Sequence, residues 1–279
     1  MHRYVALIIV LTAACFTARA HAEEYTKSFP LSGRPTVHVN SNDGGVSVRT
    51  GDTNQVEFRV IYKRLTLDRN LHIEATQQGD QVQLNVHQDW QPVSLGTRRL
   101  RIEVLMPKDG DLRVETSDGS IKVENLSGNV DLHSGDGELK VSALKGVLRM
   151  KTSDGAINGD GLDGKLEANS GDGRIRLEGR FDELKVKTGD GSVTATAKAG
   201  SKIESAWNLQ SGDGGIELTL PKDLQADVSA SSGDGHVTSD IPLAVQGVFS
   251  KSSVNGKLNG GGAPLTIHTG DGSIHLREG

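Results

Sequence analysis

The sequence predicts an all-β fold, a parallel β-solenoid with about 18 residues in each regular coil and looser coils at both ends. Five Asp-Gly pairs recur at a constant step of 18 positions, beginning at Asp118, Asp136, Asp154, Asp172 and Asp190. Apolar and polar residues alternate around these pairs, and a period of two is typical of β-strands. Glycine accounts for 35 of 279 residues and aromatic residues for only 4%. This composition suits many short strands joined by tight turns.

Residues 1–22 have the pattern of a secretory signal peptide. Basic residues open the segment, a mostly apolar run follows at residues 5–14, and Ala20-His21-Ala22 offers small residues at the cleavage positions. The apolar run is too short for a spanning helix of about 20 residues, so we expect no transmembrane segment in the mature chain. We therefore expect a periplasmic or extracellular protein. The alternative is a lipid anchor on Cys15, the only cysteine.

The composition of the mature chain excludes several classes of function. Removal of Arg3 and Arg19 leaves 29 basic residues against 36 acidic residues, a formal charge of −7. Nucleic-acid binding needs a clustered basic face, which this sequence lacks, so no nucleic-acid partner is expected. Cleavage after Ala22 would also remove Cys15, and with it any disulfide or thiolate nucleophile.

Residues 23–110 read as less regular β-strands. Apolar residues alternate at residues 37–39, 46–48, 56–60, 82–86 and 100–106, with Gly-Asp turns between some of these segments. We expect this region to form wider first coils or a cap. A cap is physically required because the end of a solenoid is an open sheet edge.

Residues 111–279 form the predicted Asp-Gly-turn repeat, with regular 18-residue units at 116–191 and looser units at 192–279. Hairpins could also use Asp-Gly turns. The constant step favours stacked coils, because a change in the length of one coil disturbs its contacts with both neighbours. Stacking would also place Asp131, Arg149, Glu167 and Lys185 side by side in four successive coils.

The last repeat, at residues 269–276, stops three residues before the C-terminus with no visible cap. We predict that this C-terminal edge is covered by nearby residues or by another chain, and that it can mediate self-association.

Two segments resemble the bacterial DUF4097 family, whose members are named adhesins. These are VLMPKDGDLRVETSDGSIKV at residues 104–123 and LTLPKDLQADVSASSGDGHV at residues 218–237. Each pairs a strand ending in Pro-Lys-Asp with a strand ending in a Ser/Thr-rich glycine turn. The resemblance covers most of the mature chain and implies an exported, all-β, solenoid-like protein. It supplies no catalytic residues, and some relatives belong to envelope-stress systems.

The repeated aspartates invite two interpretations. A stack of Asp118, Asp136, Asp154, Asp172 and Asp190 could bind Ca²⁺ through its carboxylates. We favour a structural role, in which each aspartate bonds backbone N–H groups of its own turn and the following glycine takes a positive φ. One carboxylate per coil is a thin supply for an ion with six to eight ligands.

No catalytic, cofactor or zinc pattern stands out, so we expect no enzyme and no cofactor. The histidines lack metal-ligand spacing, and the Gly-Asp-Gly turns lack the lysine and helix of a phosphate loop. Trp90 is a possible contact for a partner. The predicted role is adhesive, binding or structural, with a protein or glycan of the cell envelope as partner. The alternatives are a polysaccharide-active β-helix enzyme and an envelope-stress signalling or scaffold component.

Overall fold

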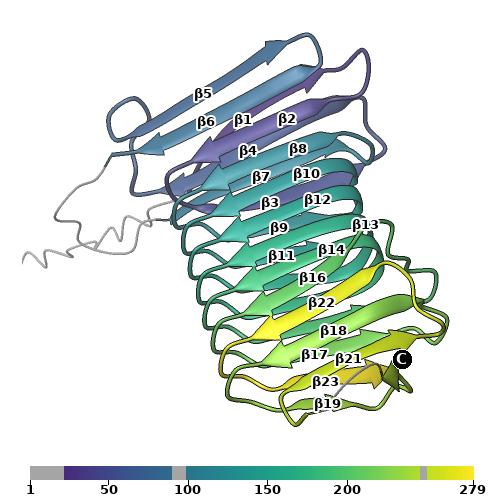
Figure 1. Cartoon of the computed structure of the whole chain (residues 1–279). Helices are drawn as coiled ribbons and strands as arrows, with labels where there is room; N and C mark the ends of the chain where they lie inside the picture. The colour runs from purple at the N-terminus through teal and green to yellow at the C-terminus, as the bar shows by residue number, and fades with distance from the viewer. Residues whose placement is uncertain (1–21, 90–98, 246–249) are drawn as a thin grey trace, which may run out of the picture.

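The computed structural model describes residues 22–89, 99–245 and 250–279. Within these ranges the chain contains 23 β-strands and no helix, which confirms the all-β prediction. All strands belong to one hydrogen-bonded sheet, and they stack along one direction (Figure 1). Two columns of strands run along this stack, and the long strands β13 and β14 pass through both.

The first column begins and ends with antiparallel pairs and is parallel between them. In stacking order it contains β5 (Leu71–Gln78), β6 (Gln81–Gln88), β2 (Thr36–Ser41), β8 (Asp111–Thr116), β10 (Ser127–Ser134), β12 (Lys145–Thr152), β13 (Ile157–Ser170), β14 (Ile175–Thr188), β16 (Trp207–Ser211), β22 (Pro264–Thr269), β18 (Ala226–Ser232), β21 (Ser253–Leu258) and β20 (Ala244–Val245).

The second column is antiparallel at its N-terminal end and parallel elsewhere. In stacking order it contains β1 (Glu23–Pro30), β4 (Gln55–Lys63), β7 (Arg99–Pro107), β3 (Gly45–Gly51), β9 (Ile121–Glu124), β11 (Leu139–Ser142), the first halves of β13 and β14, β15 (Val193–Ala197), β17 (Ile216–Leu220), β23 (Ile274–Glu278) and β19 (Val237–Ser239).

Partner residues in the middle of the stack lie 18 positions apart in the sequence. Leu112 pairs with Val130 in the first column, and Ile121 pairs with Leu139 in the second. Alternate side chains of every such strand point inward, as in β10, where Val130 and Leu132 are buried. The buried side chains of both columns form one continuous hydrophobic core.

The N-terminal end of the stack is closed by antiparallel strands. Strands β5 and β6 pair antiparallel at the end of the first column, and β1, β4 and β7 do so at the end of the second. Side chains link the two outermost strands: Lys27 Nζ donates to the carbonyl of Ala75 at 2.7 Å, and Gln77 Nε2 donates to that of Pro30 at 2.7 Å. Edge carbonyls occupied in this way offer less to an incoming strand.

The C-terminal end corrects the prediction of an open last repeat. Strand β22 lies between β16 and β18, and β23 lies between β17 and β19, so the last repeat has partners on both sides. After β17 the chain first forms β18 to β21, and only then do β22 and β23 take the places beside β16 and β17. Among the described residues, β19 and β20 are the strands that end the two columns here.

Candidate functional site

A ladder of buried hydroxyl groups holds the repeated turns. Ser134 Oγ accepts a hydrogen bond from the N–H of Gly137 at 2.9 Å and donates to the carbonyl of Gly119, in the preceding coil, at 3.0 Å. The same two bonds recur at Thr152, Ser170, Ser211 and Ser232 with their own neighbours. Each hydroxyl therefore closes its own turn and ties it to the adjacent coil.

The turn glycines are required for close approach and not for a positive φ, which corrects the sequence interpretation. A Cβ on Gly155 would lie 2.1 Å from the carbonyl oxygen of Gly137, and one on Gly137 would lie 2.1 Å from that of Gly119. Both glycines are absent from the residues with positive φ. Among the turn glycines, Gly44 differs, with a φ of 90°.

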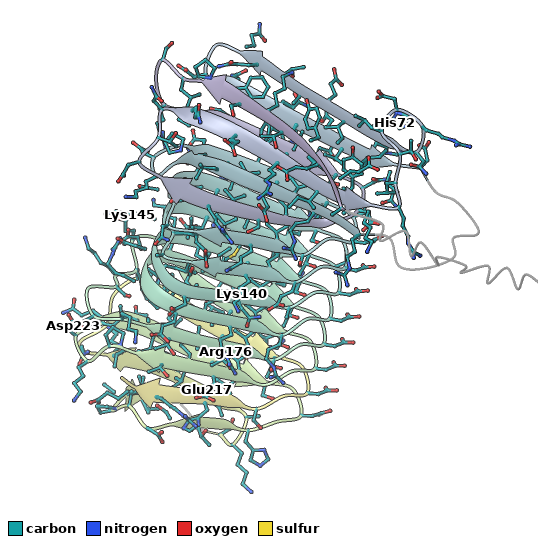
Figure 2. All side chains as sticks on the ribbon, turned by 180° about the vertical axis from the view of Figure 1, so that it is seen from behind. His72, Lys140, Lys145, Arg176, Glu217 and Asp223 are labelled. Atoms are coloured by element: carbon teal, nitrogen blue, oxygen red, sulfur yellow. The ribbon has the colours of Figure 1, made fainter. Side chains whose placement is uncertain are left out.

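The predicted aspartates line the outside of this turn edge. Asp118, Asp136, Asp154, Asp172 and Asp190 are all exposed. The backbone N–H groups of the last four bond the neighbouring turn, as Asp136 does with the carbonyl of Ser117 at 3.0 Å. The hydroxyl ladder, however, takes the capping role that we assigned to the carboxylates. Figure 2 shows the resulting row of oxygen-tipped side chains along the turns. The calcium interpretation stays a hypothesis.

No three His, Cys, Asp or Glu side chains in the described parts of the chain are grouped to hold a metal ion. In the same parts, no helix is long and apolar enough to span a membrane. Trp90, the predicted partner contact, and Cys15, the alternative lipid anchor, both lie outside the described residues.

The outer face of the first column carries charges of alternating sign. Register pairs Asp131 with Arg113 on one side and with Arg149 on the other. The row continues from Arg149 to Glu167 and then to Lys185. The predicted alignment of these residues is therefore confirmed, and it places opposite charges on neighbouring strands, which lie about 4.8 Å apart.

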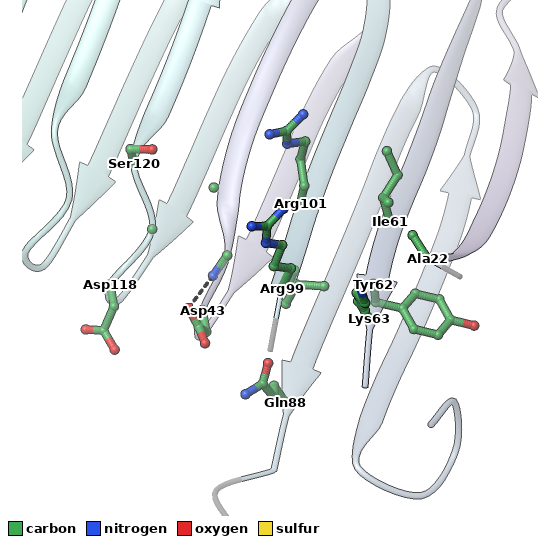
Figure 3. Close-up of a pocket in the computed structure, with 14 residues that line it drawn as sticks. Ala22, Asp43, Ile61, Tyr62, Lys63, Gln88, Arg99, Arg101, Asp118 and Ser120 are labelled. Carbon is green, nitrogen blue, oxygen red and sulfur yellow. Dashed lines mark hydrogen bonds between the residues drawn. The ribbon is translucent and has the colours of Figure 1, made fainter. Parts of the chain in front are cut away.

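A pocket of about 600 Å³ lies where β3 and β7 begin and β4 ends, beside the first turns (Figure 3). Lys63, Arg99 and Arg101 supply its positive charge, and Ile61 and Leu100 supply apolar wall. Figure 3 shows the two arginines extending between the Asp43 turn and Tyr62.

The carboxylates and the tyrosine of this pocket are accounted for by other contacts. Asp43 Oδ1 accepts a hydrogen bond from the N–H of Gly44 at 2.6 Å. Asp118 is the exposed acid of the next turn. Burial of the Tyr62 ring and the nearby carboxylate of Glu23 raise the pKa of its hydroxyl, so this group is neutral at physiological pH.

This pocket was not predicted from the sequence. Arg99 and Arg101 occupy alternate positions of one strand, and that spacing could have indicated that they share a face. Lys63, however, is 36 positions from Arg99 and meets it only through the antiparallel pairing of β4 with β7.

Residues 34–277 match the Toastrack DUF4097 family. The chain belongs to this family. The match spans nearly all of both columns, including the pocket and the turn edge, and it confirms the resemblance seen in the sequence. No curated protein matches this chain.

Solved structures with similar folds include three bacterial proteins. A "putative lipid binding protein" from Parabacteroides distasonis has 14% identity and a TM-score of 0.52, over 92% of this chain and 98% of that one. A "putative adhesin" from Bacteroides fragilis has 11% identity and a TM-score of 0.42, over 92% and 97% of the chains. A "putative cell adhesion protein" from Clostridium sporogenes has 16% identity and a TM-score of 0.32, over 93% and 100% of the chains. At such identities, the first of these indicates a shared fold.

Proposed function

We propose that this Toastrack protein is an exported, non-catalytic binding protein of the bacterial cell envelope, built on a β-solenoid with regular coils of constant length. The constant offset of 18 positions between parallel partners supports the solenoid. The basic start, apolar run and Ala20-His21-Ala22 site at the N-terminus support export. A lipid anchor at Cys15 is the alternative form of attachment.

The repetitive outer face of the first column carries this proposal. Its side chains repeat from coil to coil, as in the row from Arg113 to Lys185, and they form a rigid polar surface. Such a surface suits a ligand that is itself extended and repetitive, such as an envelope polysaccharide or the surface of an envelope protein. A glycosidase instead needs two carboxyl groups converging across one sugar-binding groove.

Binding is tested with the processed protein, purified from cells that express the full chain with its own leader. The protein is titrated with defined envelope polysaccharides and with lipid vesicles, and new reducing ends are measured in the same samples. We expect saturable binding without release of reducing ends. Polysaccharide cleavage by the wild type would overturn the non-catalytic role and support the enzyme alternative.

Paired charge reversals locate the binding face. Arg149→Glu with Lys187→Glu alters the first column, and Lys140→Glu with Arg176→Glu alters the second. All four residues are exposed, so both variants are expected to fold. We expect the first pair to weaken binding at least about tenfold more than the second. An equal effect of both pairs would contradict the proposed face.

Self-association through the C-terminal end remains a prediction, now assigned to the column ends β19 and β20. Val245 of β20 is the large apolar residue exposed there, at 46%. Light scattering tests it: a monomer at high concentration would overturn it. An envelope-stress role is tested by whether deletion of the gene changes the stress response.

A further inference from the structure

We propose that the pocket formed by Lys63, Arg99 and Arg101 binds a phosphate group of an envelope ligand. The three cations come from β4 and β7 and line one cavity with the turns at Asp43 and Asp118 (Figure 3). This site lies on the second column, away from the charged row of the first column, and the inference does not depend on that row.

The cations of this pocket lie close enough together to repel one another. Lys63 and Arg99 are direct cross-strand partners, and like charges at such positions are destabilising. None of the three cations forms an ion pair or a side-chain hydrogen bond with another described residue. We infer from these three cations without ion pairs that the pocket takes an anionic ligand, which would neutralise them.

The adjoining part of the same sheet shows the contrast. Arg59, four residues before Lys63 on β4, binds Glu24 at 2.7 Å and lies 3.5 Å from Glu103. Its guanidinium lowers the pKa of Glu24, as expected for a satisfied pair. The cation in the middle of β4 is therefore paired with carboxylates, whereas the acids that line the pocket at its end, Asp43 and Asp118, form no ion pair with the three cations.

The number of cations favours phosphate over carboxylate. A phosphate monoester carries a charge of about −1.5 to −2 at neutral pH and offers three strong acceptor oxygens, whereas a carboxylate carries one charge and two oxygens. The guanidinium groups of Arg99 and Arg101 present planar forks that match phosphate geometry, and Lys63 adds a third charge. One arginine would suffice for a carboxylate.

The cavity also accommodates more than the phosphate. Its volume of about 600 Å³ lies within the range of small-molecule sites, and Ile61 and Leu100 provide apolar surface for the remainder of the ligand. Ala22 lies on its wall, so signal-peptide cleavage after this residue would place the new α-amino group of Glu23 close by. The processed chain is therefore the form to test.

The test uses titration calorimetry with glucose 1-phosphate and with glucuronate, and sedimentation with vesicles of phosphatidylglycerol or phosphatidylcholine. The wild type is compared with Arg99→Ala/Arg101→Ala. The matched control, Lys140→Ala/Arg176→Ala, removes two exposed cations of the second column outside the pocket. We expect the pocket variant to bind the phosphate probe at least about tenfold more weakly, with the control unchanged within about twofold.

Each arm of this test decides something. Binding of glucose 1-phosphate that the pocket variant loses supports a soluble phosphate ester. Binding of phosphatidylglycerol vesicles alone, lost in the same variant, supports a lipid headgroup. Equal losses of binding in the pocket variant and the control variant would indicate general charge attraction and overturn the site. The site would also be overturned if the wild type bound neither glucose 1-phosphate nor phosphatidylglycerol vesicles. Glucuronate binding as tight as that of glucose 1-phosphate would overturn the phosphate assignment.

Discussion

The middle and the ends of this stack differ in how the backbone N–H and C=O groups of their strands find hydrogen-bond partners. Between β8 and β15, paired strands are offset by 18 positions, except at residues 162–164 of β13, where the offset to β14 is 17. At the N-terminal end, antiparallel strand pairs replace the parallel ones. At the C-terminal end, the last repeat is inserted between two earlier ones. In the interior, the repeat itself supplies the hydrogen-bond partners of each strand. At the edges, strands that do not follow the repeat supply them.

The largest expected loss of stability comes from substituting a turn glycine that contacts the neighbouring turn, in comparison with a glycine at the end of a strand. Gly155→Ala would put a Cβ 2.1 Å from the carbonyl oxygen of Gly137, so the coils must separate locally. We expect a loss of about 2–4 kcal/mol in the free energy of unfolding, measured by urea denaturation. Gly51→Ala, at the end of β3, would meet only Leu105 Cδ1 at 3.5 Å and should change stability by less than about 1 kcal/mol. Equal effects would refute the close-approach argument.

The hydroxyl ladder gives a smaller effect with the same contrast. Ser134→Ala removes a fully buried hydroxyl and leaves the N–H of Gly137 and the carbonyl of Gly119 without their partner. We expect a loss of about 1–3 kcal/mol by urea denaturation. Ser41, in the first coil, donates within its own turn to the carbonyl of Asp43, so Ser41→Ala should cost less. A larger loss of stability in Ser41→Ala than in Ser134→Ala would contradict the role of the hydroxyl ladder in joining neighbouring turns.

The smallest effect marks the boundary at which the regular coils end. Arg180 donates to Asp182 and lowers the pKa of this carboxyl below its ordinary value. The resulting stability is present above the unfolded pKa of about 3.9 and is lost as pH falls through the lower folded pKa. At pH 6 the free energy of unfolding of the wild type should exceed that of Asp182→Asn by less than about 1 kcal/mol, because the pair is partly exposed.

Urea midpoints at pH 6 and pH 3 measure this difference, which should shrink on acidification. Asp223→Asn, at an exposed position of a loop, serves as the matched control and should show no such change with pH. A difference between wild type and Asp182→Asn that is the same at both pH values would contradict the assigned cause.

Much of the middle was predictable because its constraints are local and repeated. The spacing of Asp118 to Asp190 predicted the step between partner strands, and alternation predicted which side chains are buried, such as Leu132 and Leu148. The roles within the turn were not predictable. Asp and Ser are both common turn-capping residues, and only the structure shows that Ser134, not Asp136, closes the turn.

The sequence by itself determined the all-β class, many of the inward-facing positions, the 18-position step between partner strands in the middle of the stack, and the family. Each of these follows from residue types at short, repeated spacings, which report local conformation directly. The tertiary structure alone decided the position of β22 and β23 between earlier coils, the crowding that excludes a Cβ from the turns, and the meeting of Lys63 with Arg99 and Arg101. These depend on contacts between residues far apart in the chain, and no local pattern specifies which distant strand completes an edge.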